Sequence, residues 1–294
     1  MSAAESVDIY TDDGRLLDAL VSGPLDGTVL VFHTGTPCGL VPLPGGLDPA
    51  AMGIRTVLYA RPGYGRSTPQ PGRTVADTAG DTAAILDALG ADKFFNLGWS
   101  GGGPHALACE ALLAERCLAT AVIAGIAPYT EAEVASQVRT WYEADEDNQL
   151  AFAGDIERFR QAVDAFVVQL AKATAENVAA NTKSAADRQF LSEGYGEWVA
   201  SFFSAAGVSG SHGANDDYLA SFRDWSFLLA DVGRLTIWQG TEDQNVPSYH
   251  AQWLRDHLPR AELRTLENEG HVSIIRHLPE IINTLIMNGQ STQK

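Results

Sequence analysis

The sequence has few cysteines, few basic residues and no long apolar run. Only three of its 294 residues are cysteines, Cys38, Cys109 and Cys117, and their spacing fits neither a metal site nor a disulfide framework. Such a small, odd number of thiols is typical of a reducing compartment. Lysine and arginine number 20 against 37 acidic residues, which gives a net charge of −17. This balance argues against nucleic acid and against an anionic membrane as partners.

The lack of long apolar segments bears on where the protein works. No stretch is long enough to span a bilayer, and residues 1–13 contain no apolar segment of the kind found in a signal peptide. We therefore expect a cytoplasmic protein. The length lies at or a little above the usual limit of a single domain, which suits one large core with an inserted subdomain.

Residues 96–103, with the sequence N-L-G-W-S-G-G-G, are the most informative segment. They contain G-x-S-x-G after an apolar run, which is typical of a nucleophile elbow, a sharp turn from a strand into a helix with the serine at its apex. Gly98 and Gly102 fit this turn because it brings backbone against backbone and leaves no room for a Cβ atom. Ser100 is the candidate nucleophile, and it needs a base and an acid that orients the base.

Candidates for the acid and the base follow in the chain. Residues 235–243 have the pattern of an apolar strand that ends in a polar loop with Asp243, and residues 266–271 have that of a second strand end followed by His271. Each of the three residues follows a strand, so all three would meet at one edge of a parallel sheet, where open α/β sheets bind ligands. Glu242 is a neighbouring alternative to Asp243 as the acid.

With these motifs the chain resembles the α/β-hydrolase superfamily, over residues 29–125 and from residue 235 to the C-terminus. Besides the elbow, four segments in family order carry the resemblance: the oxyanion-type loop F-H-T-G-T-P at 32–37, R-P-G-Y-G-R-S at 61–67, the acid loop at 239–247 and the histidine loop at 269–273. The order serine, aspartate, histidine is that of the family's triad. Two positions depart from the family: Thr34 stands where a histidine usually precedes the oxyanion glycine, and Tyr59-Ala60 stand where an acidic residue is common. The resemblance implies an oxyanion hole formed by the backbone N–H groups of Gly101 and Thr36.

The pattern of elements predicts an α/β fold. Strands and helices alternate over residues 28–124, which favours a doubly wound, mostly parallel sheet. Over residues 129–229 no buried strand is evident, and amphipathic stretches at 131–141, 156–174 and 195–206 predict helices. This segment resembles the helical cap, or lid, that the family inserts into its core. We therefore expect a hydrolase core at 1–128 and 230–294 and a cap at 129–229. The glycine-rich residues 207–213 are expected to form a flexible joint that contains His212 and is followed by Asp216 and Asp217. A solvated loop is expected for these polar residues, with a place at the rim of the cap as the alternative.

These observations predict a serine hydrolase that cleaves a small or medium carboxylic ester or a related acyl bond. Ser100 would attack the carbonyl carbon, an acyl-enzyme would form, and His271 would activate the water that releases the acid. The reaction needs no metal and no organic cofactor. The expected partner is a small-molecule acyl substrate, and the oligomeric state is left open, with a homodimer as one option. Two alternatives stay open: an amide or peptide hydrolase of the proline iminopeptidase type, and a non-catalytic protein that binds a small ligand on this scaffold.

Overall fold

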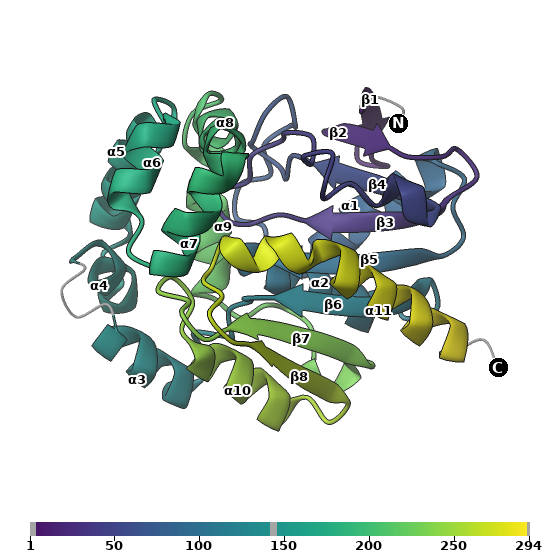
Figure 1. Ribbon diagram of the computed structural model, residues 1–294. Coiled ribbons are helices and arrows are strands. Elements are labelled where there is room, and N and C mark those ends of the chain that lie inside the picture. The colour runs from purple at the N-terminus through teal and green to yellow at the C-terminus, as the bar shows by residue number, and fades with distance from the viewer. Residues whose placement is uncertain (1–3, 142–145, 293–294) are drawn as a thin grey trace.

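A central β-sheet organises the protein (Figure 1). The computed structural model describes residues 4–141 and 146–292. Among these residues one sheet contains eight strands in the order β1-β2-β4-β3-β5-β6-β7-β8. The first two strands run antiparallel to their neighbours, and all pairs from β4 to β8 are parallel. The strands are β1 (Glu5–Tyr10), β2 (Leu16–Ser22), β3 (Thr28–His33), β4 (Ile54–Tyr59), β5 (Phe94–Trp99), β6 (Cys117–Ile123), β7 (Leu235–Gly240) and β8 (Ala261–Leu266).

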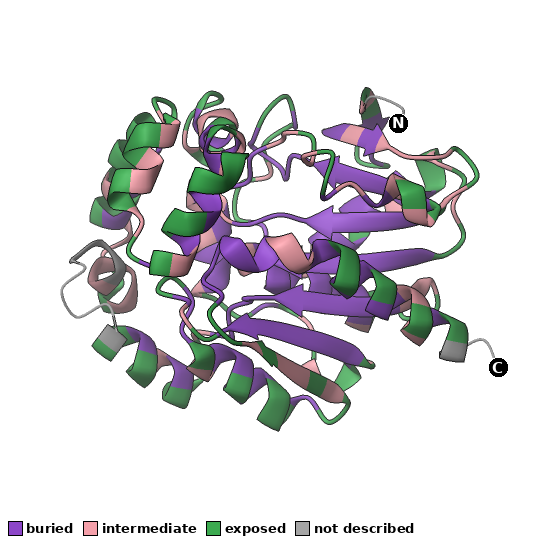
Figure 2. Ribbon diagram, viewed as in Figure 1, coloured by how far each residue is buried: buried purple, intermediate pink, exposed green. Residues whose placement is uncertain are grey.

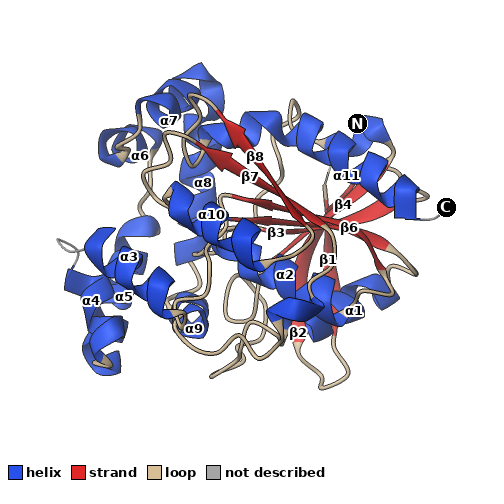
Figure 3. Cartoon of the chain, turned by 90° about the horizontal axis from the view of Figure 1, so that it is seen from below, coloured by secondary structure: helices blue, strands red, loops and turns tan. Residues whose placement is uncertain are grey.

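Helices cover both faces of this sheet, as Figure 3 shows. The alternation of side chains along β3 explains why: Leu30 and Phe32 belong to the cluster packed with α11, whereas Val29 and Val31 belong to the cluster packed with α1 on the other face. A strand whose apolar side chains point to both faces of the sheet needs cover on both sides. The covering helices are α1 (Thr78–Ala88), α2 (Gly103–Leu112), α10 (Ser248–His257) and α11 (Leu278–Thr292). The resulting burial of the central strands is visible in Figure 2.

A block of helices separates β6 from β7 in the chain, and we call residues 129–229 the helical insertion. In Figure 1 it lies beyond the carboxyl ends of the parallel strands. No strand occurs in the described part of this segment. Its elements are α3 (Ala132–Trp141), α4 (Glu146–Ala153), α5 (Ile156–Leu170), α6 (Ala175–Asn181), α7 (Ala185–Phe190), the π turn η3 (Leu191–Tyr195), α8 (Gly196–Gly207) and α9 (His212–Ser221). The 3-10 turn η4 (Leu229–Asp231) begins at the last residue of the insertion. No helix of the described residues has the length and apolar character needed to cross a membrane.

The glycine-rich residues 207–213, expected from the sequence to form a flexible joint, connect α8 to α9. A Cβ atom on Gly207 would lie 2.6 Å from the backbone nitrogen of Ala171, and one on Gly213 would lie 2.5 Å from the ring of Tyr64. These two glycines therefore allow close packing at the two ends of the segment. The expectation of a solvated Asp217 is wrong, because this residue lies on α9 and is 1% exposed.

Candidate active site

Ser100 lies at the turn between β5 and α2, as the elbow motif predicts. Its φ angle is +56°, a left-handed conformation that is uncommon for a residue with a side chain and often marks a functional site. The turn is tight enough to exclude side chains on either side of the serine. A Cβ atom on Gly98 would lie 2.5 Å from the carbonyl oxygen of Gly102, and one on Gly102 would lie 1.9 Å from that of His33. The spacing of the motif thus follows from the packing of the elbow.

Ser100, His271 and Asp243 form one chain of hydrogen bonds. The Nε2 atom of His271 lies 2.9 Å from the Oγ atom of Ser100, and its Nδ1 atom lies 2.8 Å from Oδ2 of Asp243. A carboxylate accepts hydrogen bonds, so Nδ1 carries the proton and Nε2 is left to accept the serine hydroxyl. The structure therefore brings the predicted nucleophile, base and acid together in the order that proton transfer requires.

The loop after β7 fixes the carboxylate of Asp243. Its Oδ1 atom accepts the backbone N–H groups of Asn245 and Val246, each at 2.8 Å, and its Oδ2 atom accepts the side-chain amide of Gln239 at 3.3 Å. These bonds hold the oxygen that His271 faces. Glu242, the neighbouring alternative, is partly exposed, and Asp243 is the acid that pairs with the histidine.

The surroundings of His271 favour its protonated form. Burial alone would lower its pKa, but the negative charge and hydrogen bond of Asp243, together with the charge of Asp187, raise the pKa above the ordinary value of 6.5. The backbone of His271 is held as well, because the indole N–H of Trp99 donates to its carbonyl oxygen at 3.1 Å. Phe202 of α8 packs against Trp99 with 5.9 Å between ring centroids. The helical insertion therefore contacts the side chain that holds the backbone of His271.

The two residues predicted to form an oxyanion hole are neighbours beside Ser100. A Cβ atom on Gly101 would lie 3.0 Å from the backbone nitrogen of Thr36, and one on Gly35 would lie 3.4 Å from Cβ of Ser100. The loop after β3 therefore runs along the serine. A hole of this kind uses backbone N–H groups directed at the position where negative charge develops.

A buried charge cluster lies behind this loop, and sequence reasoning missed it. Arg61 donates to the carbonyl oxygens of Thr34 at 2.7 Å and Gly35 at 2.8 Å, and its guanidinium pairs with Asp217 at 2.6 Å. Arg73 pairs with the other oxygen of Asp217 at 2.6 Å. In the sequence, the one indication of this cluster is Arg61, the first residue of the motif R-P-G-Y-G-R-S at 61–67. Its partner follows 156 residues later, beyond the reach of any local pattern.

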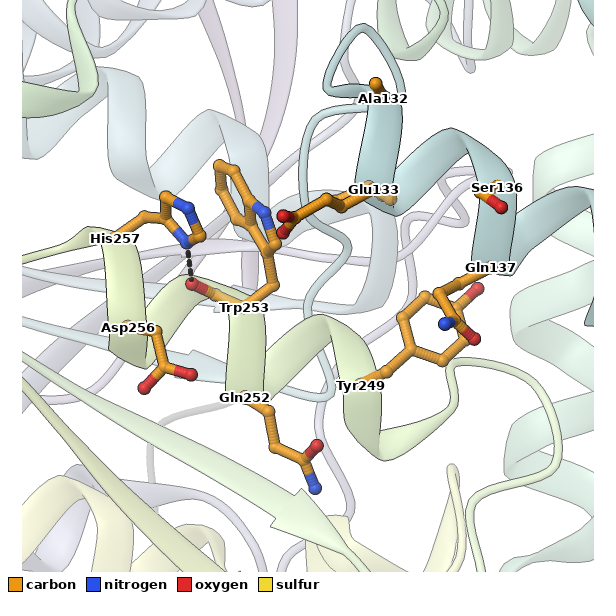
Figure 4. Close-up of a pocket in the computed structure, with 10 residues that line it drawn as sticks. Ala132, Glu133, Ser136, Gln137, Tyr249, Gln252, Trp253, Asp256 and His257 are labelled. Carbon is orange, nitrogen blue, oxygen red and sulfur yellow. Dashed lines mark hydrogen bonds between the residues drawn. The ribbon is translucent and has the colours of Figure 1, made fainter.

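Two further observations concern metal binding and the position of a surface groove. Among the described residues, no group of three or more His, Cys, Asp or Glu side chains could hold a metal ion. A surface groove of about 580 Å³ lies between α3 and α10, lined by residues that include Glu133, Tyr249 and Trp253 (Figure 4). None of the three hydrogen-bonded site residues lines this groove, so it is separate from the candidate site.

Comparison with known proteins assigns the family. The model of the alpha/beta hydrolase fold matches residues 27–278. The chain belongs to this family. The match confirms the predicted fold class and the prediction that the protein is an α/β-hydrolase. No curated protein matches the chain.

Several solved structures share the fold of this α/β-hydrolase over nearly its full length. A thermophilic esterase from Thermogutta terrifontis is 18% identical and has a TM-score of 0.68, with 98% of this chain and 99% of that chain covered. An esterase from Rhodococcus sp. ECU1013 is 18% identical with a TM-score of 0.63, covering 96% and 98%. A putative aryl esterase from Burkholderia cenocepacia is 17% identical with a TM-score of 0.60, covering 98% of each chain. At such low identities these likenesses establish the fold alone.

Proposed function

We propose that this α/β-hydrolase is a serine hydrolase that cleaves a small or medium carboxylic ester through an acyl-enzyme. The observation that carries the proposal is the hydrogen-bond chain from Ser100 through His271 to Asp243 at the elbow. A serine hydroxyl is a weak nucleophile at neutral pH and becomes reactive when a base within hydrogen-bonding distance takes its proton. The descriptions of the structural neighbours as esterases support an ester as the substrate.

In the proposed reaction Ser100 Oγ attacks the carbonyl carbon of the ester while His271 Nε2 takes the hydroxyl proton. Asp243 stabilises the imidazolium that forms. The negative oxygen of the tetrahedral intermediate accepts the backbone N–H groups of Gly101 and Thr36; loss of one such donor typically lowers the rate by ~10²–10³-fold. The intermediate collapses as His271 gives the proton to the departing alcohol, and the acyl group stays on Ser100. His271 then takes a proton from water while the water attacks the acyl carbon. The bond between the acyl carbon and Ser100 Oγ breaks as His271 gives this proton to Oγ, and the carboxylic acid leaves.

We assign the helical insertion, residues 129–229, the role of a cap that covers a core formed by residues 1–128 and 230–294. Its helices lie beyond the strand ends that carry the site (Figure 1), where walls of a pocket are needed to hold a small acyl substrate. The proposed steps use side chains and backbone groups of this chain and call for no cofactor. The three cysteines are unpaired, which fits our proposal that the enzyme works in the cytoplasm.

Labelling with a fluorophosphonate tests the proposal, because this probe reacts with an activated serine. We expect the wild type to be labelled and Ser100→Ala and His271→Ala to stay unlabelled. Ser201→Ala is the matched control, since Ser201 is exposed and its hydroxyl bonds within its own helix. Hydrolysis of p-nitrophenyl esters of increasing chain length then measures the acyl preference. A folded wild type that neither reacts with the probe nor hydrolyses any ester would contradict the proposal and favour a ligand-binding protein.

A further inference from the structure

A carboxylate from the helical insertion reaches the loop that carries His271. Asp187, on α7, accepts the backbone N–H group of His271 at 3.1 Å through Oδ2. Its Oδ1 atom accepts the N–H groups of Val272 at 2.9 Å and Ser273 at 2.8 Å. Asp187 itself is 2% exposed. The three successive N–H groups that follow Gly270 therefore converge on one buried carboxylate that comes from another part of the fold.

The loop has a space that the Asp187 carboxylate fills. A Cβ atom on Gly270 would lie 2.4 Å from Oδ1, 2.6 Å from Cγ and 2.6 Å from Oδ2 of Asp187, and these are its three nearest atoms. Any side chain at residue 270 would push the carboxylate away from the loop. A second bond closes the loop on itself, because the hydroxyl of Ser273 accepts the N–H group of Gly270 at 2.7 Å. The absence of a side chain at Gly270 therefore makes room for the carboxylate of Asp187.

A carboxylate bonded to backbone N–H groups is well suited to fixing a loop. Bonds to an ionised acceptor are shorter and stronger than bonds between neutral groups, and a buried carboxylate is costly unless its oxygens are satisfied. Leaving buried N–H groups without an acceptor is costly as well. The three bonds thus stabilise one backbone conformation, and the direction of the His271 side chain depends on that conformation.

We propose that Asp187 is a positioning residue for His271, so that the helical insertion takes part in orienting the catalytic base instead of only covering the pocket. The proposal rests on the function proposed above. Asp187 acts through the loop backbone and touches neither substrate nor reacting atoms. Its negative charge adds a second effect, because it favours the imidazolium that forms during each proton transfer.

The charges around His271 define the electrostatic part of the proposal. Asp243 on the loop after β7 and Asp187 on α7 both raise the pKa of His271, against the effect of burial. Among the other charged side chains on these elements, Arg276 pairs with Glu193 and Glu269, and His277 pairs with Glu269. Arg188 on α7 donates to the backbone carbonyl oxygens of Thr182 and Lys183. Removing the charge of Asp187 therefore lowers the pKa of His271, and the base stays unprotonated to a lower pH.

The first experiment measures the pH dependence of kcat and KM for a p-nitrophenyl ester in wild type, Asp187→Asn and Glu193→Gln. Glu193 is the control because it joins the insertion to Arg276 at the surface, at 3.2 Å. We expect Asp187→Asn to reduce kcat by about tenfold to 10²-fold, as small misplacements of catalytic groups do, with little change in KM. Its acid limb should move to lower pH, while Glu193→Gln keeps the wild-type profile. An unchanged kcat and acid limb in Asp187→Asn, or an equal effect of Glu193→Gln, would overturn the proposal.

A double-mutant cycle tests the contact between Asp187 and Gly270. Gly270→Ala alone should lower kcat, because its methyl group displaces the carboxylate. In Asp187→Ala the three clashing atoms are gone, so adding Gly270→Ala should cause little further loss. Contacting residues show such non-additivity, whereas independent sites add. Additive losses would mean that Gly270 serves the loop for another reason, and the proposed contact would carry no function.

An NMR titration separates this proposal from the proposed function. The imidazole signals of His271, assigned by their loss in His271→Gln, are followed against pH in wild type and Asp187→Asn. We expect the apparent pKa of His271 to be lower in the variant. This readout requires no substrate, so a protein inactive toward esters would contradict the proposed function while Asp187 is still tested. Identical titrations in the two proteins would contradict the role of Asp187.

Discussion

The carboxylate of Asp217 is the point at which a single substitution should destabilise the protein most clearly. It accepts six hydrogen bonds: two each from Arg61 and Arg73, one from the hydroxyl of Tyr64 and one from that of Thr36. The side chain of Asp217 is 0% exposed, and those of the two arginines are 1% and 3% exposed. Asp217→Asn would keep the shape but set an amide N–H₂ group against donors and leave two buried cations without a counter-charge.

The size of this effect follows from the burial. Removing one partner of a buried ion pair costs about 3–5 kcal/mol, because the remaining charge has lost its solvent and its partner. The free energy of unfolding of a typical domain is only ~5–15 kcal/mol, so a large share of the stability is at stake. Asp216→Asn is the matched control. Asp216 is the preceding residue, and its side chain accepts the backbone N–H group of Gly72 at 3.3 Å on the surface, so we expect a change within about 0.5 kcal/mol.

The pH dependence gives an independent check. Burial disfavours the charged form of Asp217, but the positive charges of Arg61 and Arg73 outweigh it and hold the pKa well below the ordinary 3.8. A lowered pKa in the folded state adds stability that is fully present above the unfolded value and is lost as the pH falls below it. The free energy of unfolding of the wild type should therefore drop below about pH 4. Asp217→Asn should show a shallower acid dependence.

Urea unfolding followed by tryptophan fluorescence, at neutral pH and at several acidic values, measures both effects. The reasoning would be refuted if Asp217→Asn unfolded at the same urea concentration as Asp216→Asn at neutral pH. It would also be refuted if the two variants lost stability equally on acidification, since the titration of Asp217 is absent from one of them.

Two further predictions concern His271, the proposed base, and the exposed face of α1. Ester hydrolysis by the wild type should decline as the pH falls below the pKa of His271, because a protonated imidazole cannot accept the serine proton. Asp243→Asn should lower that pKa, move the acid limb to lower pH and reduce kcat strongly, which a pH profile of kcat/KM measures. Gly80 lies exposed in α1, and a Cβ atom added there would meet nothing within 4 Å beyond the backbone of its own helix. Gly80→Ala should therefore raise the free energy of unfolding by ~0.5–1 kcal/mol, and an unchanged or lower urea midpoint would contradict this.

The sequence is informative wherever the signal is local. The strands 28–33 and 93–99 are predicted because most of their positions are apolar. The elbow is predicted from its G-x-S-x-G pattern, whose glycines are required by close backbone contacts. The residues predicted as a triad lie in one hydrogen-bonded chain, although their catalytic roles stay predictions. Parallel strands bring their ends to one edge of the sheet, so motifs far apart in the chain can be expected to meet there.

Local sequence patterns predict least about the structure of the helical insertion. Helices α4 and α9 have almost no hydrophobic periodicity, and α6 and α7 are short, so none of the four was predicted. Asp187 and Asp217 are ordinary polar residues in such segments, and the groups that they bind lie 84 to 86 and 144 to 181 residues away in the chain. A buried role of this kind depends on tertiary contacts, and the sequence around each residue resembles that of a solvated surface.

The position of the helical insertion between β6 and β7 sets an order of events on the ribosome. Strands β1 to β6 and the insertion are synthesised first, so the Arg61–Asp217 cluster can form while β7, β8 and α11 are still absent. At that stage β6 is an edge strand with unpaired backbone groups, a type of edge that readily pairs with other chains. Pairing of β7 with β6 covers this edge, and β8 then delivers the histidine loop to a serine already in place. Ser100, the proposed nucleophile, would therefore be folded before His271, its proposed base, reaches it with the last fifth of the chain.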